Sequence, residues 1–197
     1  MMKNSGAMDT PDRSYLHFVR KVREAFAFLT DEGFVEIDAL PTLVRFHKSG
    51  IEVDVYHGRQ SYELGAGVTF SGTRYAMSEI VRATDPEAAK GYRNAVATTP
   101  EGVAAGLEAL SSLMERYGSA ALKGHAGFFS MLEAQRRQWL EEYTLDVLAS
   151  QLRPKADDAF RRGDYSAAAA LYGRIRDRLS PAETKKLALA EGRSRRP

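Results

Sequence analysis

Two short segments of alternating apolar and polar residues flank a Ser-Gly pair, and they constrain the fold more than any other feature. The segments read TLVRFHK at residues 42–48 and IEVDVYH at residues 51–57. A period of two places successive side chains on opposite faces of a strand, and a Gly-containing pair suits a tight hairpin turn. Pairing the strands around this turn matches apolar residues and opposite charges, with these opposite pairs: His47 and Glu52, Phe46 and Val53, Arg45 and Asp54, Val44 and Val55. The pattern predicts an antiparallel hairpin with one apolar and one polar face.

Two further segments extend this hairpin into a four-stranded meander. FVEI precedes it at residues 34–37, and SYELGAGVTF follows it at residues 61–70. Keeping one apolar face through the last strand predicts three more opposite pairs: Val55 and Leu64, Val53 and Ala66, Ile51 and Val68.

A helical period precedes the strands. Apolar residues recur at helical spacing, which predicts a helix from about Pro11 to Glu32 with Gly33 as its stop; they are Tyr15, Phe18, Val19, Val22, Phe26 and Leu29. Residues 1–13 have no apolar run and are expected to form a mobile tail, ahead of an α+β domain over residues 14–98.

Helix starts are marked by a capping residue before proline, because the capping oxygen satisfies a free N–H and proline suits the first turn. Such pairs occur at Thr10-Pro11, Asp85-Pro86, Thr99-Pro100 and Ser180-Pro181, and Ser180 forms a capping box with Glu183. Residues 99–197 are predicted to be helical. A first stripe ends before Gly118 and comprises Val103, Leu107, Leu110, Met114 and Tyr117.

A long helix is expected next, with an apolar side that we expect to be buried: Phe128 or Phe129, Leu132, Trp139, Tyr143, Val147 and Leu148. The aromatic residues at helical spacing are interpreted as core and not as a cofactor-binding box. Pro154 is expected to end or kink this helix.

The segment AFRRGDYSAAAALY, starting at Ala159, resembles the turn of a tetratricopeptide repeat. Gly163 would take a left-handed turn, Tyr165 would wedge between two helices, and Ala168 would let them approach closely. One copy is present, whereas about three are needed for a peptide-binding solenoid. We therefore expect a single hairpin at about 154–179 and a final helix at about 181–192. The fold class is α+β, with the N-terminal helix packed on the meander and an α-helical half after it.

The polar face of the sheet holds the candidate ligand-binding residues Arg45, His47, Glu52, Asp54 and Tyr56, flanked by Glu63 and Thr69. Gly65 and Gly67 would leave open space beside them. Three interpretations follow: a site for a small polar ligand, a metal site of His47, Glu52 and Asp54, or a solvated ladder of charges. The last is favoured.

The stretch SGIEVDV, at residues 49–55, resembles the carboxylate strand of polymerase-beta-like nucleotidyltransferases, which implies magnesium-dependent phosphoryl transfer by Glu52 and Asp54. The Gly-Ser loop and helix that this family places before the strand are missing. No nucleophile-elbow, phosphate-loop or dinucleotide motif occurs. We expect neither catalytic residues nor a cofactor.

Composition narrows the class of partner. There is no cysteine, which suits a reducing cytoplasm, and no apolar run is long enough for a membrane span. The net charge is +2, and residues 151–197 hold twelve basic and six acidic residues without interleaved aromatic residues, so nucleic acid is not an expected partner. The layout resembles a class of uncharacterised bacterial proteins and, in fold only, small α+β immunity proteins. The expectation is a protein that binds another protein, as an immunity-like protein or an adaptor.

Overall fold

A computed structural model describes residues 13–194 of the chain. The chain divides after Glu133 into two compact units, here called the sheet unit and the helical unit. The chain is helical from the cap at Thr99 as predicted, but the first of these helices, Pro100–Tyr117, packs into the core under the sheet and so belongs to the sheet unit. The expected tail lies outside the described residues except for Arg13, which is buried.

The elements of the sheet unit are η1 Ser14–Leu16, α1 Phe18–Ala25, α2 Ala27–Asp31, β1 Val35–Leu40, β2 Leu43–Lys48, β3 Ile51–His57, β4 Leu64–Phe70, β5 Thr73–Ala76, α3 Met77–Thr84, α4 Pro86–Gly91, α5 Pro100–Tyr117 and α6 Ser119–Leu122. Helix α7, Ala126–Arg161, begins in the sheet unit and continues into the helical unit. The helical unit also holds α8 Tyr165–Gly173, η2 Arg176–Arg178 and α9 Pro181–Ser194.

The predicted first helix is interrupted. His17 has a positive φ of 52°, and Phe26 leaves helical geometry with φ −101° and ψ 23°, so η1, α1 and α2 follow one another. Four residues of the predicted apolar side are buried: Phe18, Val22, Phe26 and Leu29. Val19 is partly buried, whereas Tyr15 is 50% exposed. The cap at Thr10-Pro11 lies outside the described residues.

The sheet is antiparallel and has five strands in the order β1-β2-β3-β4-β5. The predicted pairing of β2 with β3 is confirmed at all four positions. The prediction of four strands missed β5, which follows a turn at Ser71-Gly72 with φ of 50° and 78°.

The predicted register of β3 with β4 is wrong by two residues, because Val55 lies opposite Ala66 and Ile51 opposite Phe70. The loop between these strands closes with a hydrogen bond of 2.7 Å from the Gly58 N–H to the Glu63 carbonyl. A shift of two preserves the apolar face, since side chains alternate with a period of two.

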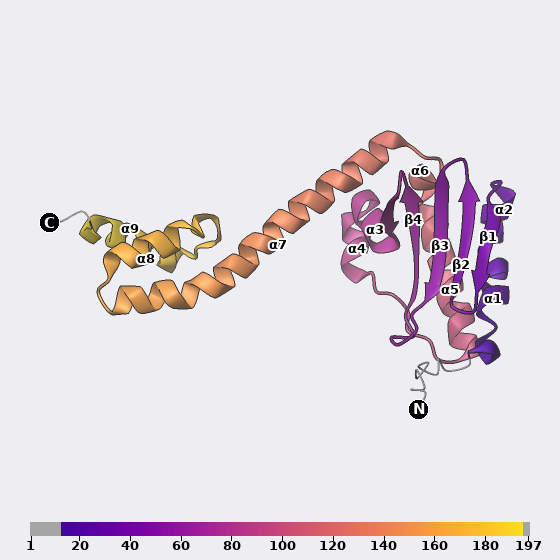
Figure 1. Cartoon of the computed structure of the whole chain (residues 1–197), viewed down its shortest axis with the longest axis horizontal. Coiled ribbons are helices and arrows are strands. Elements are labelled where there is room, and N and C mark those ends of the chain that lie inside the picture. The colour runs from indigo at the N-terminus through magenta and orange to yellow at the C-terminus, as the bar shows by residue number, and fades with distance from the viewer. Residues whose placement is uncertain (1–12, 195–197) are drawn as a thin grey trace, which may run out of the picture. The chain divides into compact units, whose positions relative to one another are not determined.

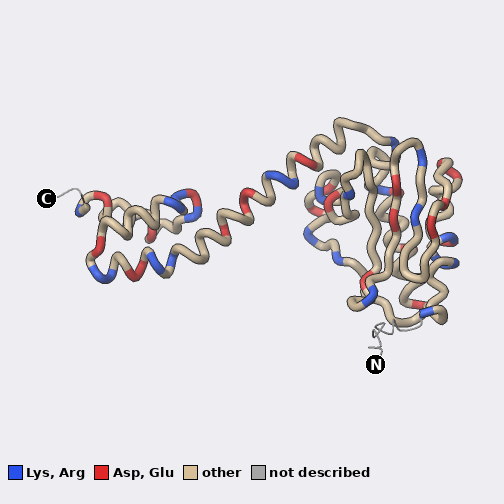
Figure 2. The backbone as a smooth tube through the Cα atoms, viewed as in Figure 1, with Lys and Arg blue, Asp and Glu red and all other residues tan. Residues whose placement is uncertain are grey.

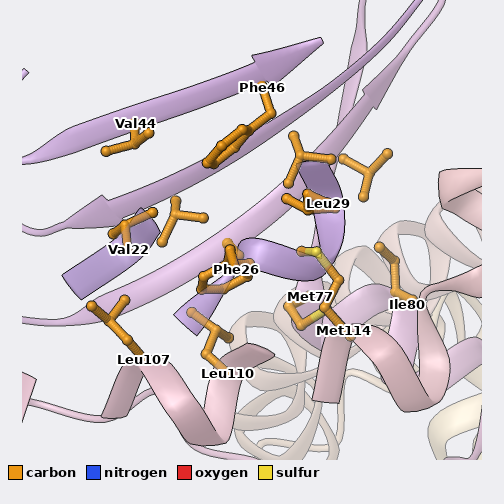
Figure 3. Close-up of a cluster of buried hydrophobic side chains, with 14 of the residues drawn as sticks. Val22, Phe26, Leu29, Val44, Phe46, Met77, Ile80, Leu107, Leu110 and Met114 are labelled. Carbon is orange, nitrogen blue, oxygen red and sulfur yellow. The ribbon is translucent and has the colours of Figure 1, made fainter. Parts of the chain in front are cut away.

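The core of the sheet unit lies between one face of the sheet and its helices (Figure 1). Figure 3 shows Val44 and Phe46 of β2 directed toward residues of α1, α2, α3 and α5. All five members of the predicted α5 stripe are buried, and α5 ends before Gly118 as expected. The caps at Asp85 and Thr99 are confirmed by hydrogen bonds from the N–H groups of Ala88 and Gly102.

The helical unit confirms the predicted hairpin. Gly163 has φ 79° between α7 and α8, and Ala168 is fully buried where α8 packs in its cluster. The capping box is present, with the Ser180 N–H donating to Glu183 at 2.7 Å and the Glu183 N–H donating to the Ser180 hydroxyl at 3.3 Å.

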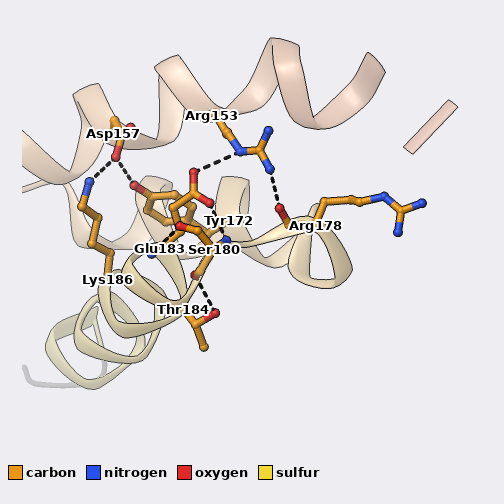
Figure 4. Close-up of polar contacts among 8 residues, drawn as sticks. All are labelled: Arg153, Asp157, Tyr172, Arg178, Ser180, Glu183, Thr184 and Lys186. Atoms are coloured by element: carbon orange, nitrogen blue, oxygen red, sulfur yellow. Dashed lines mark hydrogen bonds and ion pairs between the residues drawn. The ribbon is translucent and has the colours of Figure 1, made fainter. Parts of the chain in front are cut away.

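A polar network fastens α7 to α9 and, through a hydrogen bond from Arg153 to the Arg178 carbonyl, to the end of η2 (Figure 4). The Arg153 guanidinium contacts Glu183 at 3.0 Å. Asp157 accepts hydrogen bonds from Tyr172 and Lys186, and these bonds hold the pKa of its carboxyl below the ordinary value. The hairpin is therefore a packed and bonded part of the helical unit.

Two expectations for α7 can be compared with the structure. Of the two alternatives given for Pro154, an end of the helix is excluded, because α7 continues to Arg161. Phe129 and Leu132 are buried as expected, whereas Trp139 is 51%, Tyr143 is 56% and Val147 is 37% exposed. The spacing of these aromatic residues was read as a core stripe, but no described element covers them.

Candidate functional site

The polar face of the sheet, here called the outer face, is built by the strand register. Opposite residues in antiparallel strands share a face. One row across the sheet therefore holds His47, Glu52, Thr69 and Arg74, and the next holds Arg45, Asp54 and Gly67.

The central contact of the outer face is an ion pair between Asp54 and Arg74. The Arg74 Nε and Nη2 donate to the two carboxylate oxygens at 2.8 and 2.6 Å. The sequence correctly placed Arg45 opposite Asp54, but Arg45 contacts Glu52 instead, at 3.7 Å. Arg74 was missed because β5 was not predicted; the Ser71-Gly72 pair followed by alternating residues was the available signal.

The expected open space above the two glycines of β4 is occupied. A Cβ atom on Gly65 would lie 2.4 Å from the Tyr56 ring, and one on Gly67 would lie 2.6 Å from the Arg74 guanidinium. These glycines therefore make room for side chains of the protein itself. Tyr56 and Arg74 lie close together, with the guanidinium carbon 5.6 Å from the ring centre.

The charge states on this face are fixed by their neighbours. Burial raises the pKa of the Tyr56 hydroxyl, and the hydrogen bond to Asp54 raises the pKa of Arg74. Neither group is thereby poised to exchange a proton near neutral pH.

Seven residues line a shallow hollow of about 340 Å³ on the outer face: Leu43, Arg45, Glu52, Asp54, Tyr56, Thr69 and Arg74. Four of the five candidate residues are thus brought together, whereas His47 is exposed and outside this set. Within residues 13–194 no group of three His, Asp or Glu side chains could hold a metal ion, which argues against the metal site of His47, Glu52 and Asp54.

The nucleotidyltransferase interpretation requires two carboxylates that are free to coordinate magnesium, and both candidates are paired with arginines. Asp54 is held by Arg74 and Glu52 by Arg45. Two carboxylates that coordinate magnesium would have to give up both ion pairs. Each of the two carboxylates in the hollow is therefore balanced by an arginine.

The outer face becomes apolar at β1, an edge strand of the sheet. Val35, Ile37 and Leu40 are 66%, 54% and 43% exposed. The register places Val35 opposite His47 and Leu40 opposite Leu43, with an irregularity between Glu36 and Asp38. The sequence predicted a strand here but did not identify it as an exposed edge.

A second polar cluster, missed in the sequence, lies on the buried side of the same sheet. The His57 Nε2–H donates to the Ala97 carbonyl at 2.9 Å, and Arg13 donates to the Gly58 carbonyl at 2.8 Å. Burial lowers the pKa of His57. These bonds join the loop before α5 and the start of η1 to the end of β3, so the role of the cluster is structural.

The basic residues near the C-terminus are largely paired with acids. Arg161 and Arg162 contact Asp158, and Arg176 contacts Glu191. Figure 2 shows both signs of charge interspersed along the helical unit. The expectation that nucleic acid is not a partner stays a prediction.

Comparison with protein-family models, curated proteins and solved structures found no match for this chain. Within residues 13–194, none of the helices combines the length and the apolar character that crossing a bilayer would require.

Proposed function

We propose that this chain is a non-enzymatic protein that binds another protein, and that the free edge of β1 receives an extended strand of that partner. The observation that carries the proposal is the exposure of Val35, Ile37 and Leu40 on an edge strand. An edge strand offers unpaired backbone N–H and C=O groups, and its side chains add specificity.

The charge on β1 indicates which strand would fit. Glu36 is already held by Arg23, with hydrogen bonds of 2.8 and 2.7 Å. Asp38 has no ion pair within the described residues. Antiparallel pairing of β1 with itself about Ile37 would set Glu36 against Asp38, which is unfavourable for like charges. The edge therefore favours a partner strand with apolar residues and a basic residue opposite Asp38.

We further propose that this binding serves an immunity-like or adaptor role. Both roles require a stable contact with another protein and no chemical step. The pairing of Glu52 with Arg45 and of Asp54 with Arg74 supports this proposal, because neither of these two carboxylates in the hollow is free.

Co-purification from the native host at low salt tests the proposal. We expect the wild-type chain to retain a partner in a fixed ratio, and Ile37→Lys to reduce retention at least tenfold. The matched control is Leu189→Lys, which changes an exposed apolar residue of α9 and should retain the partner. The proposal fails if no partner is retained, if both variants retain it equally, or if Arg74→Ala abolishes retention while Ile37→Lys does not.

A further inference from the structure

The cluster around His57 contains a buried positive charge. Arg13 is 5% exposed and His57 is 1% exposed. The Arg13 guanidinium donates to the carbonyls of Gly58 and Arg59 and lies 4.0 Å from the centre of the Tyr62 ring. Within the described residues no acidic side chain is paired with Arg13, and its Nε–H is buried without a hydrogen-bond partner. A buried arginine is ordinarily paired with an acid, whereas every bond that holds Arg13 runs to a neutral group.

The hydrogen bonds of the His57 ring fix the position of its proton. The Nε2 atom lies 2.9 Å from the Ala97 carbonyl, which can only accept, so Nε2 carries the proton. The Nδ1 atom lies 3.4 Å from the Nη1 of Arg13, which can only donate, so Nδ1 accepts. A second proton on the ring therefore binds at Nδ1 and places two positively charged N–H donors against each other. Protonation of His57 turns its contact with Arg13 from attractive to repulsive.

The other neighbours of the His57 ring do not offset this repulsion. Among the described residues, the titratable side chains that contact the ring are Arg13 and the uncharged phenol Tyr62, whose ring meets it at 5.7 Å in an edge contact. Burial lowers the pKa of His57, the backbone of Ala97 partly opposes this effect, and the charge of Arg13 lowers the pKa further. The remaining neighbours bring no charge: Phe18 from α1 and Leu64 from β4.

We propose that His57, besides its structural role, is a pH switch that releases Arg13 from the loop of residues 58–63 when the ring is protonated. Arg13 is the group that leaves, because His57 is paired with Leu64 within the sheet, whereas Arg13 precedes η1 and is attached to the loop through its side chain. Release brings the buried Nε–H of Arg13 into contact with water. The switch does not depend on the proposed binding of a strand at β1.

Release should increase as the pH falls. In the released state His57 has an ordinary pKa of about 6.5, and in the closed state its pKa is lower. The equilibrium constant for opening should therefore rise below about pH 6.5, by about three- to tenfold between pH 7.5 and 5.5.

Amide hydrogen exchange followed by NMR, corrected for the intrinsic effect of pH, measures this opening. The Leu16 N–H donates to the Arg13 carbonyl and the Tyr62 N–H donates to the Gly58 carbonyl, so these two amides report on the turn and the loop. The Val55 N–H in β3 reports on unfolding of the whole unit. We expect exchange at Leu16 and Tyr62 to accelerate as the pH falls, and to do so more than exchange at Val55.

Three variants test the origin of the response. His57→Gln keeps a donor and an acceptor but cannot be protonated, so it should abolish the response. His47→Gln removes an exposed histidine of β2 and is the matched control that should keep it. Arg13→Gln removes the repelling charge, so the pKa of His57, followed by its ring signals in NMR, should rise toward the ordinary value. This last measurement also tests the proposal if His57→Gln does not fold.

Four outcomes would overturn the proposal. They are exchange at Leu16 and Tyr62 that does not respond to pH, exchange that accelerates only together with that at Val55, a response that persists in His57→Gln, and a pKa of His57 that is unchanged in Arg13→Gln. None of these measurements involves β1, so their failure would leave the proposed function untouched.

Discussion

Gly67 has no side chain, and the ion pair between Asp54 and Arg74 depends on that absence. The guanidinium crosses β4 at the point where a Cβ atom would stand. Asp54 is buried beneath it, so the pair is less screened than the solvated ladder that the sequence suggested. At this scale one small residue on a neighbouring strand decides which arginine a carboxylate binds.

Gly67→Ala is expected to displace Arg74 and lower the free energy of unfolding by about 1–3 kcal/mol, because a buried carboxylate loses its charged hydrogen bonds. Urea unfolding measures the change. Gly91→Ala, where a Cβ would meet nothing within 4 Å, is the control. The substitution should cost much less in an Arg74→Ala background; an equal cost in both backgrounds would contradict this explanation.

His57 should make stability depend on pH. Its pKa is lowered in the folded chain, so the unfolded chain binds a proton first as the pH falls. The free energy of unfolding should therefore be unaffected by this group well above the ordinary pKa of about 6.5 and should decrease as the pH falls below it. Urea titrations at pH 7.5, 6.5 and 5.5 measure this loss. His57→Gln should show a smaller decrease between pH 6.5 and 5.5, and an unchanged decrease would assign the effect to other groups.

At the scale of elements, helix α7 has one side that packs in a buried cluster and another side that is exposed. Leu152 faces the cluster that includes Ile175, whereas Trp139 and Tyr143 face away from it and stay exposed. Helical spacing indicated which residues share a side, but spacing carries no information on what covers that side. The interpretation of the aromatic residues as core was wrong for this reason.

The hairpin of α7 and α8 depends on a small set of local contacts. Gly163→Val should lower the free energy of unfolding by about 1–2 kcal/mol, because a β-branched residue is strained at positive φ. Ala168→Leu should cost about 1–3 kcal/mol by overpacking a fully buried position. Gly163→Asn and Ala170→Leu, the latter at an exposed position of α8, are the controls. Equal melting temperatures for variants and controls would contradict a structural role for the turn.

At the scale of the whole molecule, the two units have separate apolar cores. The core of the sheet unit extends from Leu16 to Leu132, and the helical unit holds two smaller clusters. Since α5 and the start of α7 complete the first core, the division falls after Glu133. The boundary at residue 99 followed the change from strands to helices, which is a change of secondary structure and not of packing.

Truncation should test the boundary after Glu133 and the need for the hairpin. A chain ending at Glu133 keeps the core of the sheet unit and should melt cooperatively. A chain ending at Arg153 removes Ile175 and leaves Leu148 and Leu152 uncovered, so it should aggregate. Size-exclusion chromatography and thermal melting measure both. A chain ending at Arg153 that stays monodisperse would show that α8 and α9 are not needed to cover this part of α7.

The sequence by itself determined the features whose partners are close along the chain. The register of β2 with β3 followed from a two-residue turn, the capping box followed from the spacing of Ser180 and Glu183, and Gly163 marked a left-handed turn. Such features depend on a few neighbouring residues, so local rules are sufficient to predict them.

The tertiary structure alone decided the features that depend on which elements become neighbours. The choice of Arg74 over Arg45 as the partner of Asp54 required β5 to lie beside β4. The exposure of Ile37 required β1 to lie at the edge of the sheet, and the exposure of Trp139 required that no element pack on that side of α7. Residue spacing specifies which side chains share a face, but only the packing of distant segments determines what, if anything, covers it.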